Sequence, residues 1–488
     1  MARRAASQVV ETELDLSQYY RPTAKQRAFH SCPADIVLYG GAAGGGKSKA
    51  LLWEAFLEML ETPYNHGLLL RRTYPELEQS LILESLKLFP RSVCEYRVGE
   101  KRWYFKNGSV LDFGYSEQEK DIYRYQSAEF GFIGFDELTH FTYEQWDYLV
   151  NSRLRSSAPG AWPRVRASTN PGNVGHAWVK ELFIEPAMRL FPGLKPQQIP
   201  GALWFDEHGT SYAFIPAKAT DNEYLMRNDP KYLDRLNKLD PKWKAALLEG
   251  DWDVFSGKFF TQLDEKVHKV PFFIPPEGWP IFRVMDWGHA KPYSIGLYAV
   301  DPNGSLYRFY ELYGWSGKPD EGTRETAREV AKKLKAKEIE LLGPRRAATI
   351  TGVADPSCWN KTGVSKDGRP ISIIEEFFAE GLRFRKANND RINGWEAVRN
   401  RLAVDEYGVP GLYIANTCTH FWRTMPMLVH DENNPEDLAK GQEDHVADEV
   451  RYACSSPLAR PSLQQYTQRY HEDTQPRRPW VRSKVVGY

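Results

Sequence analysis

The chain has 488 residues, of which 42% are hydrophobic and 26% charged, so it fits a globular protein with a sizeable core and excludes a disordered one. Lysine plus arginine and aspartate plus glutamate both number 64, and this zero net charge neither supports nor excludes a basic groove for nucleic acid. No run approaches the ~18 apolar residues of a membrane helix, and the five scattered cysteines form no CxxC pair, which argues against a zinc site or a disulfide framework and favours an intracellular setting.

In the first third of the chain, strand-like apolar runs alternate with helical patterns, as in a parallel sheet covered by helices. The expected strands are 35–39, 67–70, 130–135 and 163–168, and the expected helices are 48–60 and 142–154. Residues 220–250 look helical and polar, with lysines and arginines among aromatic and leucine residues.

A second α/β region follows a glycine- and aspartate-rich stretch, where we expect a boundary near 255–272. Its expected strands are 279–285, 294–300, 305–310 and 350–354, and its expected helices lie near 371–380, near 394–403 and from 446. The Asp-Pro-Asn-Gly turn at 301–304 predicts a hairpin between two of these strands. From residue 460 on, six lysines and arginines face two acids, which predicts a flexible basic tail.

The strongest motif is GAAGGGKS, which matches GxxxxGK[ST] and stands between an apolar strand and a helix. In this context glycines let backbone N–H groups surround the β-phosphate of a nucleotide, while the lysine contacts the β- and γ-phosphates and the serine hydroxyl binds Mg²⁺. The residues assigned to this ATP site are Gly41, Gly44, Gly45, Gly46, Lys47 and Ser48.

A second strand of such a site should end in acids, and Phe132–Phe135 is followed directly by Asp136 and Glu137. We expect Asp136 to hold Mg²⁺ and Glu137 to polarise the attacking water. The adjacent glutamate favours ATP hydrolysis over nucleotide binding alone.

Weaker features accompany this site. The amide of Gln26 could recognise adenine, and Asn170 ends the next strand where a polar side chain can touch the γ-phosphate or the attacking water. Rings of ATPases need an arginine inserted into a neighbour's site. Arg124 is our candidate for that role, with Arg71 and Arg72 as rivals.

Carboxylates dominate the second half. Asp286 and Asp355 each end an expected strand, and Asp448 lies at the start of an expected helix, three residues after His445. Three acids that converge at one sheet edge would select Mg²⁺ or Mn²⁺, and two such ions would bind the attacking and leaving oxygens of a phosphodiester. His445 could join them as a ligand or proton carrier.

Two other interpretations remain. One is a helicase-type ATPase whose second half only binds nucleic acid, although no arginine-rich QxxGRxxR motif follows the ATPase core. The other is a structural docking protein with a vestigial P-loop, against which the intact Lys47, Ser48, Asp136 and Glu137 argue.

Taken in order, GAAGGGKS, FIGFDE, STNPG, LLEGDWDVFSGKFF, VMDWG, VADPS and DHVADEVRY resemble the large terminase subunit of tailed bacteriophages, from about Gln26 to Tyr452. The resemblance implies an α/β chain with an N-terminal additional-strand, RecA-like P-loop ATPase domain and a C-terminal RNase H-like nuclease domain. The implied layout is an ATPase domain at 1–255 with a lid at about 185–250, a linker at 256–272, a nuclease domain at 273–459 and a tail at 460–488.

By motif position the resemblance assigns Lys47, Ser48, Asp136 and Glu137 to the ATPase and Asn170 to coupling of hydrolysis to movement. Asp286, Asp355 and Asp448 would be the nuclease metal ligands, with His445 beside them and Asp444 as the rival of Asp448. The implied cofactors are ATP with Mg²⁺, and Mg²⁺ or Mn²⁺ for the nuclease. Where some members carry an arginine in the P-loop, this chain has Ala42 to Gly45, so any sensing role of that arginine is absent or has moved.

The implied function is ATP-driven translocation of double-stranded DNA into a prohead and endonucleolytic cleavage of concatemeric DNA. The implied partners are DNA, the portal and prohead, a small terminase subunit and further copies of the chain in a ring, commonly of five, with a monomer as the alternative in solution and no membrane partner. The expected location is the cytoplasm of an infected bacterium.

Overall fold

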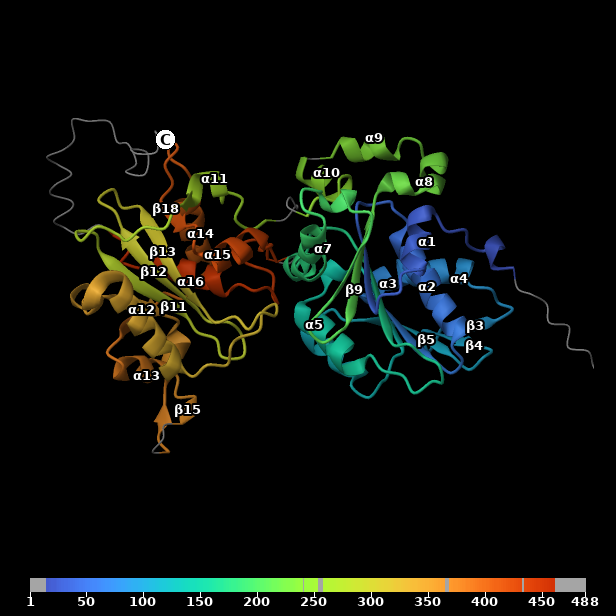
Figure 1. Ribbon diagram of the computed structural model, residues 1–488, viewed down its shortest axis with the longest axis horizontal. Coiled ribbons are helices and arrows are strands. Elements are labelled where there is room, and N and C mark those ends of the chain that lie inside the picture. The colour runs from blue at the N-terminus through green and yellow to red at the C-terminus, as the bar shows by residue number, and fades with distance from the viewer. Residues whose placement is uncertain (1–14, 240, 253–257, 365–367, 432–433, 461–488) are drawn as a thin grey trace, which may run out of the picture. The chain divides into compact units, whose positions relative to one another are not determined.

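A computed structural model of the protein describes residues 15–239, 241–252, 258–364, 368–431 and 434–460. The chain divides into two compact units, residues 1–256 and 257–488 (Figure 1). The basic tail predicted from residue 460 lies, apart from Arg460, outside the described residues.

The first unit is built on a nine-stranded sheet in the order β3-β4-β5-β2-β6-β7-β1-β9-β8. The six strands from β5 to β9 in this order are parallel, while β3, β4 and β8 add antiparallel edges. The strands are β1 Ile36–Gly41, β2 His66–Arg71, β3 Cys94–Arg97, β4 Arg102–Phe105, β5 Val110–Tyr115, β6 Phe132–Asp136, β7 Arg164–Thr169, β8 Ala202–Phe205 and β9 Ser211–Ala217.

Helices cover both faces of this sheet because alternate residues of each strand point to opposite sides. On β1, Val37 and Tyr39 pack in the core beneath α1 and α2, whereas Ile36 and Leu38 pack in the core beneath α5 and α7. The helices are α1 Ala24–His30, α2 Lys47–Glu61, α3 Tyr74–Leu77, α4 Leu83–Leu88, α5 Tyr143–Tyr148, α6 His176–Val179, α7 Glu185–Leu190, α8 Glu223–Asn228, α9 Tyr232–Asn237 and α10 Pro241–Leu247.

The lid expected at about 185–250 is wrong in its first half. Strand β9 pairs with β1 over six residues and therefore belongs to the main sheet, together with its antiparallel partner β8. The apolar, largely buried run Ser211–Ala217 is a strand signal that the sequence interpretation missed. Only the helical segment 219–250, with α8, α9 and α10, lies outside the sheet and contacts the P-loop.

The second unit has a seven-stranded sheet in the order β10-β18-β13-β12-β11-β14-β17. Strands β11, β12 and β13 form an antiparallel meander, and β14 and β17 follow β11 in parallel, which is the strand arrangement of an RNase H-like fold. The strands are β10 Lys269–Val270, β11 Ile281–Asp286, β12 Ser294–Val300, β13 Leu306–Tyr313, β14 Thr351–Ala354, β17 Arg383–Lys386 and β18 Leu412–Ala415, with a separate small pair β15 Gly363–Val364 and β16 Pro370–Ile371. The predicted α/β fold class is confirmed.

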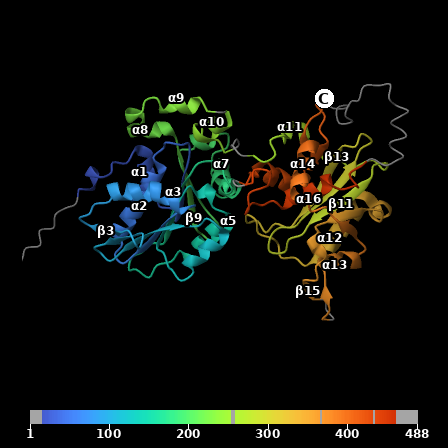
Figure 2. The same cartoon turned by 180° about the vertical axis from the view of Figure 1, so that it is seen from behind.

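Two helical layers enclose the second sheet, as Figure 2 shows from behind. One core joins the sheet to α12 and α13, and the other joins it to α14, α15 and α16. The helices are α11 Glu265–His268, α12 Ala327–Ala347, α13 Ile373–Ala379, α14 Arg391–Leu402, α15 Thr419–Thr424 and α16 His445–Cys454.

The linker expected at 256–272 is also wrong from residue 258 on. Phe259 and Phe260 are buried in the second core, and β10 pairs with β18. Two adjacent aromatic side chains bury too much apolar surface to remain in a solvated connection. The predicted hairpin is present, since β12 and β13 are antiparallel and Asp301 accepts a hydrogen bond from the Ser305 N–H in the turn.

Among the described residues, no helix combines the length and apolar character required to cross a membrane.

Candidate active sites

The P-loop connects β1 to α2 at the carboxyl edge of the first sheet. Gly46 has φ +74°, and a Cβ there would lie 2.7 Å from Gln26 Nε2, so glycine alone fits both the conformation and the space. Helix α2 begins at the next residue, Lys47. The backbone N–H groups at this helix start are the donors that phosphate oxygens need.

A chain of polar contacts links three of the predicted residues across two strands. Lys47 Nζ donates to Asn170 Oδ1 at 2.9 Å and to the Ala42 carbonyl at 2.6 Å. The Asn170 amide nitrogen lies 3.3 and 3.4 Å from the two carboxylate oxygens of Glu137. One asparagine therefore bridges the P-loop cation and the acid expected to activate water.

Asp136 is fully buried at the end of β6. Its Oδ1 accepts from the Ser168 hydroxyl at 2.5 Å, whereas its Oδ2 forms no hydrogen bond and lies 3.4 Å from Arg71 Nε. A buried carboxylate oxygen without a hydrogen bond is costly unless a cation or water satisfies it. This donor fits Mg²⁺ beside the nucleotide, with the Ser48 hydroxyl as the second expected ligand.

Glu137 has a left-handed backbone conformation, with φ 56° and ψ 58°. Such strain in a residue other than glycine costs of the order of 1 kcal/mol or more and is common at functional sites. Burial and the neighbouring Asp136 raise the pKa of Glu137, and burial lowers the pKa of Lys47. Buried groups shifted in this way, with specific charged partners, are typical of catalytic sites.

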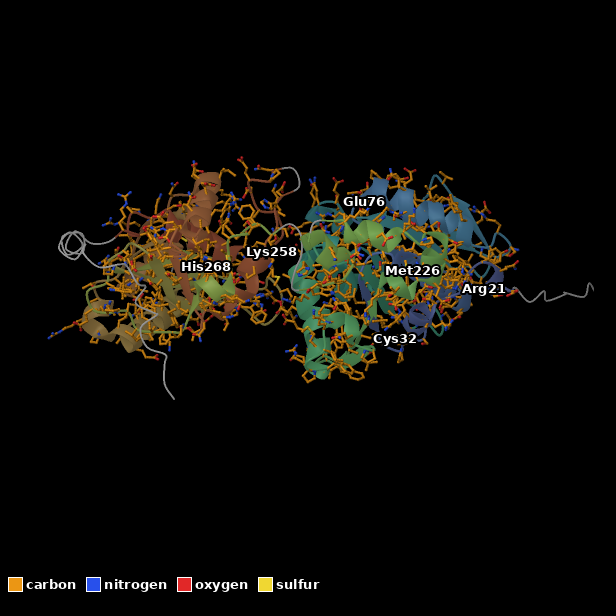
Figure 3. All side chains as sticks on the ribbon, turned by 90° about the horizontal axis from the view of Figure 1, so that it is seen from above. Arg21, Cys32, Glu76, Met226, Lys258 and His268 are labelled. Carbon is orange, nitrogen blue, oxygen red and sulfur yellow. The ribbon has the colours of Figure 1, made fainter. Side chains whose placement is uncertain are left out.

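A cavity of about 500 Å³ lies beside the P-loop between the segment before α1 and helix α8. Figure 3 labels one residue of each segment, Arg21 and Met226. Tyr19, Tyr20 and Tyr224 line the cavity and offer aromatic faces for a nucleobase. Gln26 also lines it, but its Oε1 accepts from the Thr23 N–H and its Nε2 donates to the Gly46 carbonyl, so its amide mainly ties α1 to the P-loop.

The helical segment 219–250 rests directly on the P-loop. Asn222 Nδ2 donates to the Gly44 carbonyl at 2.8 Å, and the Ala43 N–H donates to the Leu247 carbonyl at 2.7 Å. Gly250 has φ +61°, and a Cβ there would lie 2.7 Å from the Ala42 nitrogen. A change in the P-loop backbone would therefore be felt by this segment at three points.

We expect Gly250→Ala to weaken ATP binding, because the added methyl group would push the P-loop backbone away from its position. The left-handed conformation adds a cost of roughly 1–2 kcal/mol to folding. Binding of a fluorescent ATP analogue and the melting temperature are the measurements. Gly209→Ala is the matched control, since Gly209 has φ +84° with nothing within 4 Å of a Cβ. Equal ATP affinity of the two variants would contradict the proposed contact.

The three candidate arginines lie in different surroundings. Arg124 is exposed, donates to Asp121 at 3.1 Å and lies over the Tyr115 ring. Arg71 points inward to Asp136 of its own chain, and Arg72 donates to Gln145 at 2.8 Å. Of the three, Arg124 has the exposure that a contact with another subunit requires.

In the second unit, Asp286 and Asp355 leave two neighbouring parallel strands. Met285 pairs with Ala354 in the β11–β14 register, and the Asp355 N–H donates to the Met285 carbonyl at 3.1 Å. The two acids therefore emerge side by side at one sheet edge. The Tyr452 hydroxyl of α16 donates to Asp355 and brings this helix to the same edge.

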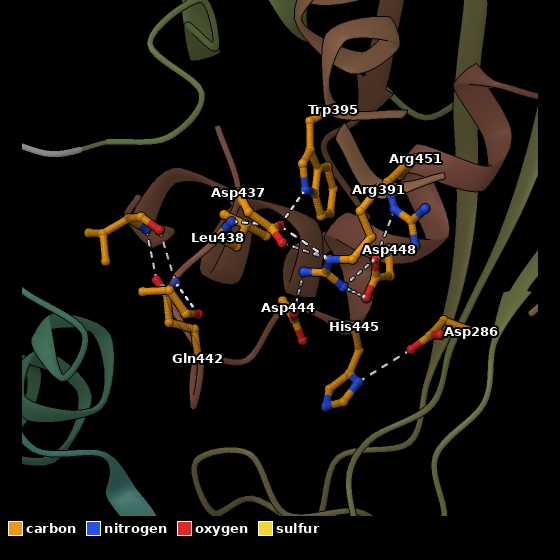
Figure 4. Close-up of polar contacts among 12 residues, drawn as sticks. Asp286, Arg391, Trp395, Asp437, Leu438, Gln442, Asp444, His445, Asp448 and Arg451 are labelled. Atoms are coloured by element: carbon orange, nitrogen blue, oxygen red, sulfur yellow. Dashed lines mark hydrogen bonds and ion pairs between the residues drawn. The ribbon is translucent and has the colours of Figure 1, made fainter. Parts of the chain in front are cut away.

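Helix α16 supplies the remaining predicted residues, as Figure 4 shows. His445 Nδ1 lies 3.3 Å from Asp286 Oδ2, and its Nε2 lies 3.1 Å from Asp320 Oδ1. Asp448, one turn later, contacts Arg391 at 3.2 Å and Arg451 at 2.7 Å. The rival acid Asp444 lies 3.6 Å from the same Arg391.

The electrostatics of this edge reflect crowded carboxylates. Burial, with Asp448 and Asp444 nearby, raises the pKa of Asp286 to about 7, against the opposing effect of His445. Burial and Asp448 raise the pKa of Asp444 to about 6. Within the described ranges, no group of three or more His, Cys, Asp or Glu side chains is arranged to hold a metal ion. The oxygen donors fit Mg²⁺ or Mn²⁺ in kind, but they are engaged in ion pairs.

A buried ion pair holds α16 on the sheet. Arg308 of β13 and Glu449 of α16 are fully buried and lie 2.7 Å apart, and Glu449 also accepts from Ser294. Removing one partner of such a pair costs about 3–5 kcal/mol because the other charge is left unpaired. This pair fixes the rotation of α16 and with it the direction of Asp448.

Sequence reasoning missed four polar residues at these sites: Asn222, Asp320, Arg391 and Tyr452. None stands in a motif whose spacing predicts chemistry. Asp320 has φ 54°, a conformation that only the structure reveals. Tyr452 could have been found, since it lies one turn after Asp448 and therefore on the same helix face.

Comparison with known proteins identifies one family model, described as "Terminase large subunit, T4likevirus-type, N-terminal", which matches residues 38–267. No curated protein was found to match the chain. Solved structures with a similar fold include the large terminase of a thermophilic bacteriophage in complex with ADP, at 18% identity over 89% of this chain and 99% of that one, with a TM-score of 0.37. The bacteriophage HK97 large terminase is 9% identical over 89% and 95%, with a TM-score of 0.41, and the P22 large terminase nuclease domain is 16% identical over 43% and 96%, with a TM-score of 0.32.

Proposed function

Since the chain belongs, through residues 38–267, to the large terminase subunits of tailed bacteriophages, we propose that it packages viral DNA. It translocates double-stranded DNA at the expense of ATP and cuts concatemeric DNA with a second, metal-dependent centre. The observation that carries the proposal is the contact chain from Lys47 through Asn170 to Glu137. A vestigial P-loop would have no reason to keep a buried lysine, amide and carboxylate in one line.

In the ATPase reaction, Lys47 would leave Asn170 to contact the β- and γ-phosphates, while the P-loop N–H groups hold the β-phosphate. Glu137 would then accept a proton from the attacking water, and its raised pKa suits that role. Bound Mg²⁺ would neutralise charge on the phosphates at Asp136 and Ser48. Tyr19, Tyr20 and Tyr224 would enclose the base.

Coupling to movement would use two connections. Asn170 would respond to the γ-phosphate because it contacts both Lys47 and Glu137. The segment 219–250 would follow the P-loop through its contacts with Ala43 and Gly44. Contacts to DNA would be made with phosphates, so translocation should show little sequence preference and strong salt dependence.

The nuclease would use Asp286, Asp355 and Asp448 to hold two Mg²⁺ or Mn²⁺ ions, with His445 as a neighbouring ligand or proton carrier. The metal chemistry supplied there is activation of water and stabilisation of charge on the phosphodiester. Tyr452 would orient Asp355, and the buried Arg308–Glu449 pair would orient α16.

The active form would be a ring of identical subunits, commonly five, on the portal of a prohead, with a small terminase subunit selecting the DNA in the host cytoplasm. The exposed Arg124 would reach into the ATP site of the neighbouring subunit. Arg71 would instead serve its own site, because it points to Asp136.

The test of translocation is ATP-dependent displacement of a triplex-forming oligonucleotide from linear double-stranded DNA. We expect the wild-type chain to displace it and Lys47→Ala to lose displacement and ATP hydrolysis together. Lys87→Ala is the control, since Lys87 lies on α4 with a side chain 73% exposed and pairs only with Glu84 at the surface. ATP hydrolysis by the wild-type chain without any displacement would leave an ATPase but refute the translocase.

A further inference from the structure

Arg391 is the exposed cation beside the acids of the proposed nuclease centre. It is the first residue of α14, and its guanidinium lies between three aspartates that come from the chain after residue 430 (Figure 4). Its Nε is 3.2 Å from Asp437, its Nη1 is 3.2 Å from Asp448 and its Nη2 is 3.6 Å from Asp444.

The anchor of this arginine is itself fixed. Asp437 accepts hydrogen bonds from Trp395 Nε1 and from the Leu438 N–H, each at 2.8 Å. The Arg391 guanidinium also lies over the Trp395 ring, 5.2 Å from its centroid. Asp437 and Trp395 therefore hold Arg391 in place independently of the two acids of the nuclease centre.

A second arginine contacts Asp448 but differs in mobility. Arg451 lies one turn later on the same helix with a side chain only 1% exposed, whereas the Arg391 side chain is 37% exposed. Arg451 is thus part of the core, and Arg391 is the cation that can turn toward solvent.

Carboxylates this close need a neighbouring positive charge when no metal ion is bound, because like charges in a partly buried site repel. The same Asp448 and Asp444 oxygens cannot coordinate a divalent ion and keep their contacts with Arg391. We infer that Arg391 is a positioning residue that takes the place of the divalent cation at Asp444 and Asp448 and is displaced when metal binds. This inference rests on the proposed nuclease centre.

Isothermal titration of the full chain with Mn²⁺ alone tests it. Arg391→Gln should bind Mn²⁺ about fivefold or more tightly, the size of one partly exposed ion pair. Arg391→Lys keeps the charge but cannot contact three carboxylates at once, so its affinity should lie between the two. Arg399→Gln, which removes the same charge from α14 but contacts Glu396 instead of the three aspartates, should match the wild type.

A second readout separates charge from packing. In EDTA, Arg391→Gln should melt at a lower temperature than Arg399→Gln, because the acids are left without their cation. Saturating Mn²⁺ should remove that difference. Unchanged or weaker Mn²⁺ binding by Arg391→Gln, with a wild-type Arg399→Gln, would overturn the inference and leave the proposed nuclease intact. If neither wild type nor Arg391→Gln binds Mn²⁺, the metal centre and the displacement are both refuted.

Discussion

Glu137→Gln should reduce ATP hydrolysis by about 10²- to 10⁴-fold while ATP binding stays close to that of the wild type, because a positioned general base contributes this much. The glutamine keeps the shape of the side chain and can still accept from the Asn170 amide nitrogen, but it cannot take a proton from water. Single-turnover hydrolysis of radiolabelled ATP and binding of a fluorescent analogue are the two measurements.

Glu129→Gln is the control for this experiment. Glu129 lies just before the same strand, β6, and forms a surface ion pair with Arg155 at 2.9 Å. Its loss should leave hydrolysis unchanged. Near-normal hydrolysis by Glu137→Gln would remove the assignment of the general base, and loss of ATP binding would show that Glu137 serves the fold of the site instead.

Asp286→Asn should abolish cleavage of supercoiled plasmid with Mn²⁺, by at least ~100-fold, since a metal-held phosphodiester gains several kcal/mol of transition-state stabilisation. The substitution keeps the hydrogen bond with His445 possible but removes the charge that a divalent ion needs. Asp355→Ala should have the same effect. Gel analysis of nicked and linear products over time measures the rate.

Asp301→Asn is the matched control for the nuclease. Asp301 lies in the β12–β13 turn, where an asparagine oxygen can accept the same hydrogen bond from the Ser305 N–H. Its cleavage rate should equal that of the wild type. Equal nicking by wild type, Asp286→Asn and Asp355→Ala would show that the activity belongs to a contaminant or to another site.

The sequence predicted the strands that carry the sites because their signals are local. Apolar runs of four to six residues that end in a glycine loop or an acid define β1, β6, β11 and β14. Their parallel pairing then places Asp136 beside Ser168, and Asp286 beside Asp355, without further information.

What the sequence could not supply depends on long-range packing. Strand β9 lies next to β1, with Tyr212 paired to Ile36, although the two strands are far apart in the chain. Arg391 reaches Asp448 through the contact of α14 with α16, and no spacing between them is diagnostic. The direction of Arg71 toward its own Asp136 likewise follows from the β2–β6 pairing and not from a motif.

The account claims two separate centres on one chain, and the most direct test is DNA cleavage by Lys47→Ala with Mn²⁺ and no ATP. Lys47 belongs to the first unit, and the acids Asp286, Asp355 and Asp448 belong to the second. The account predicts plasmid cleavage at the wild-type rate by a protein that no longer hydrolyses ATP. Loss of cleavage in this variant, with its melting behaviour unchanged, would contradict it.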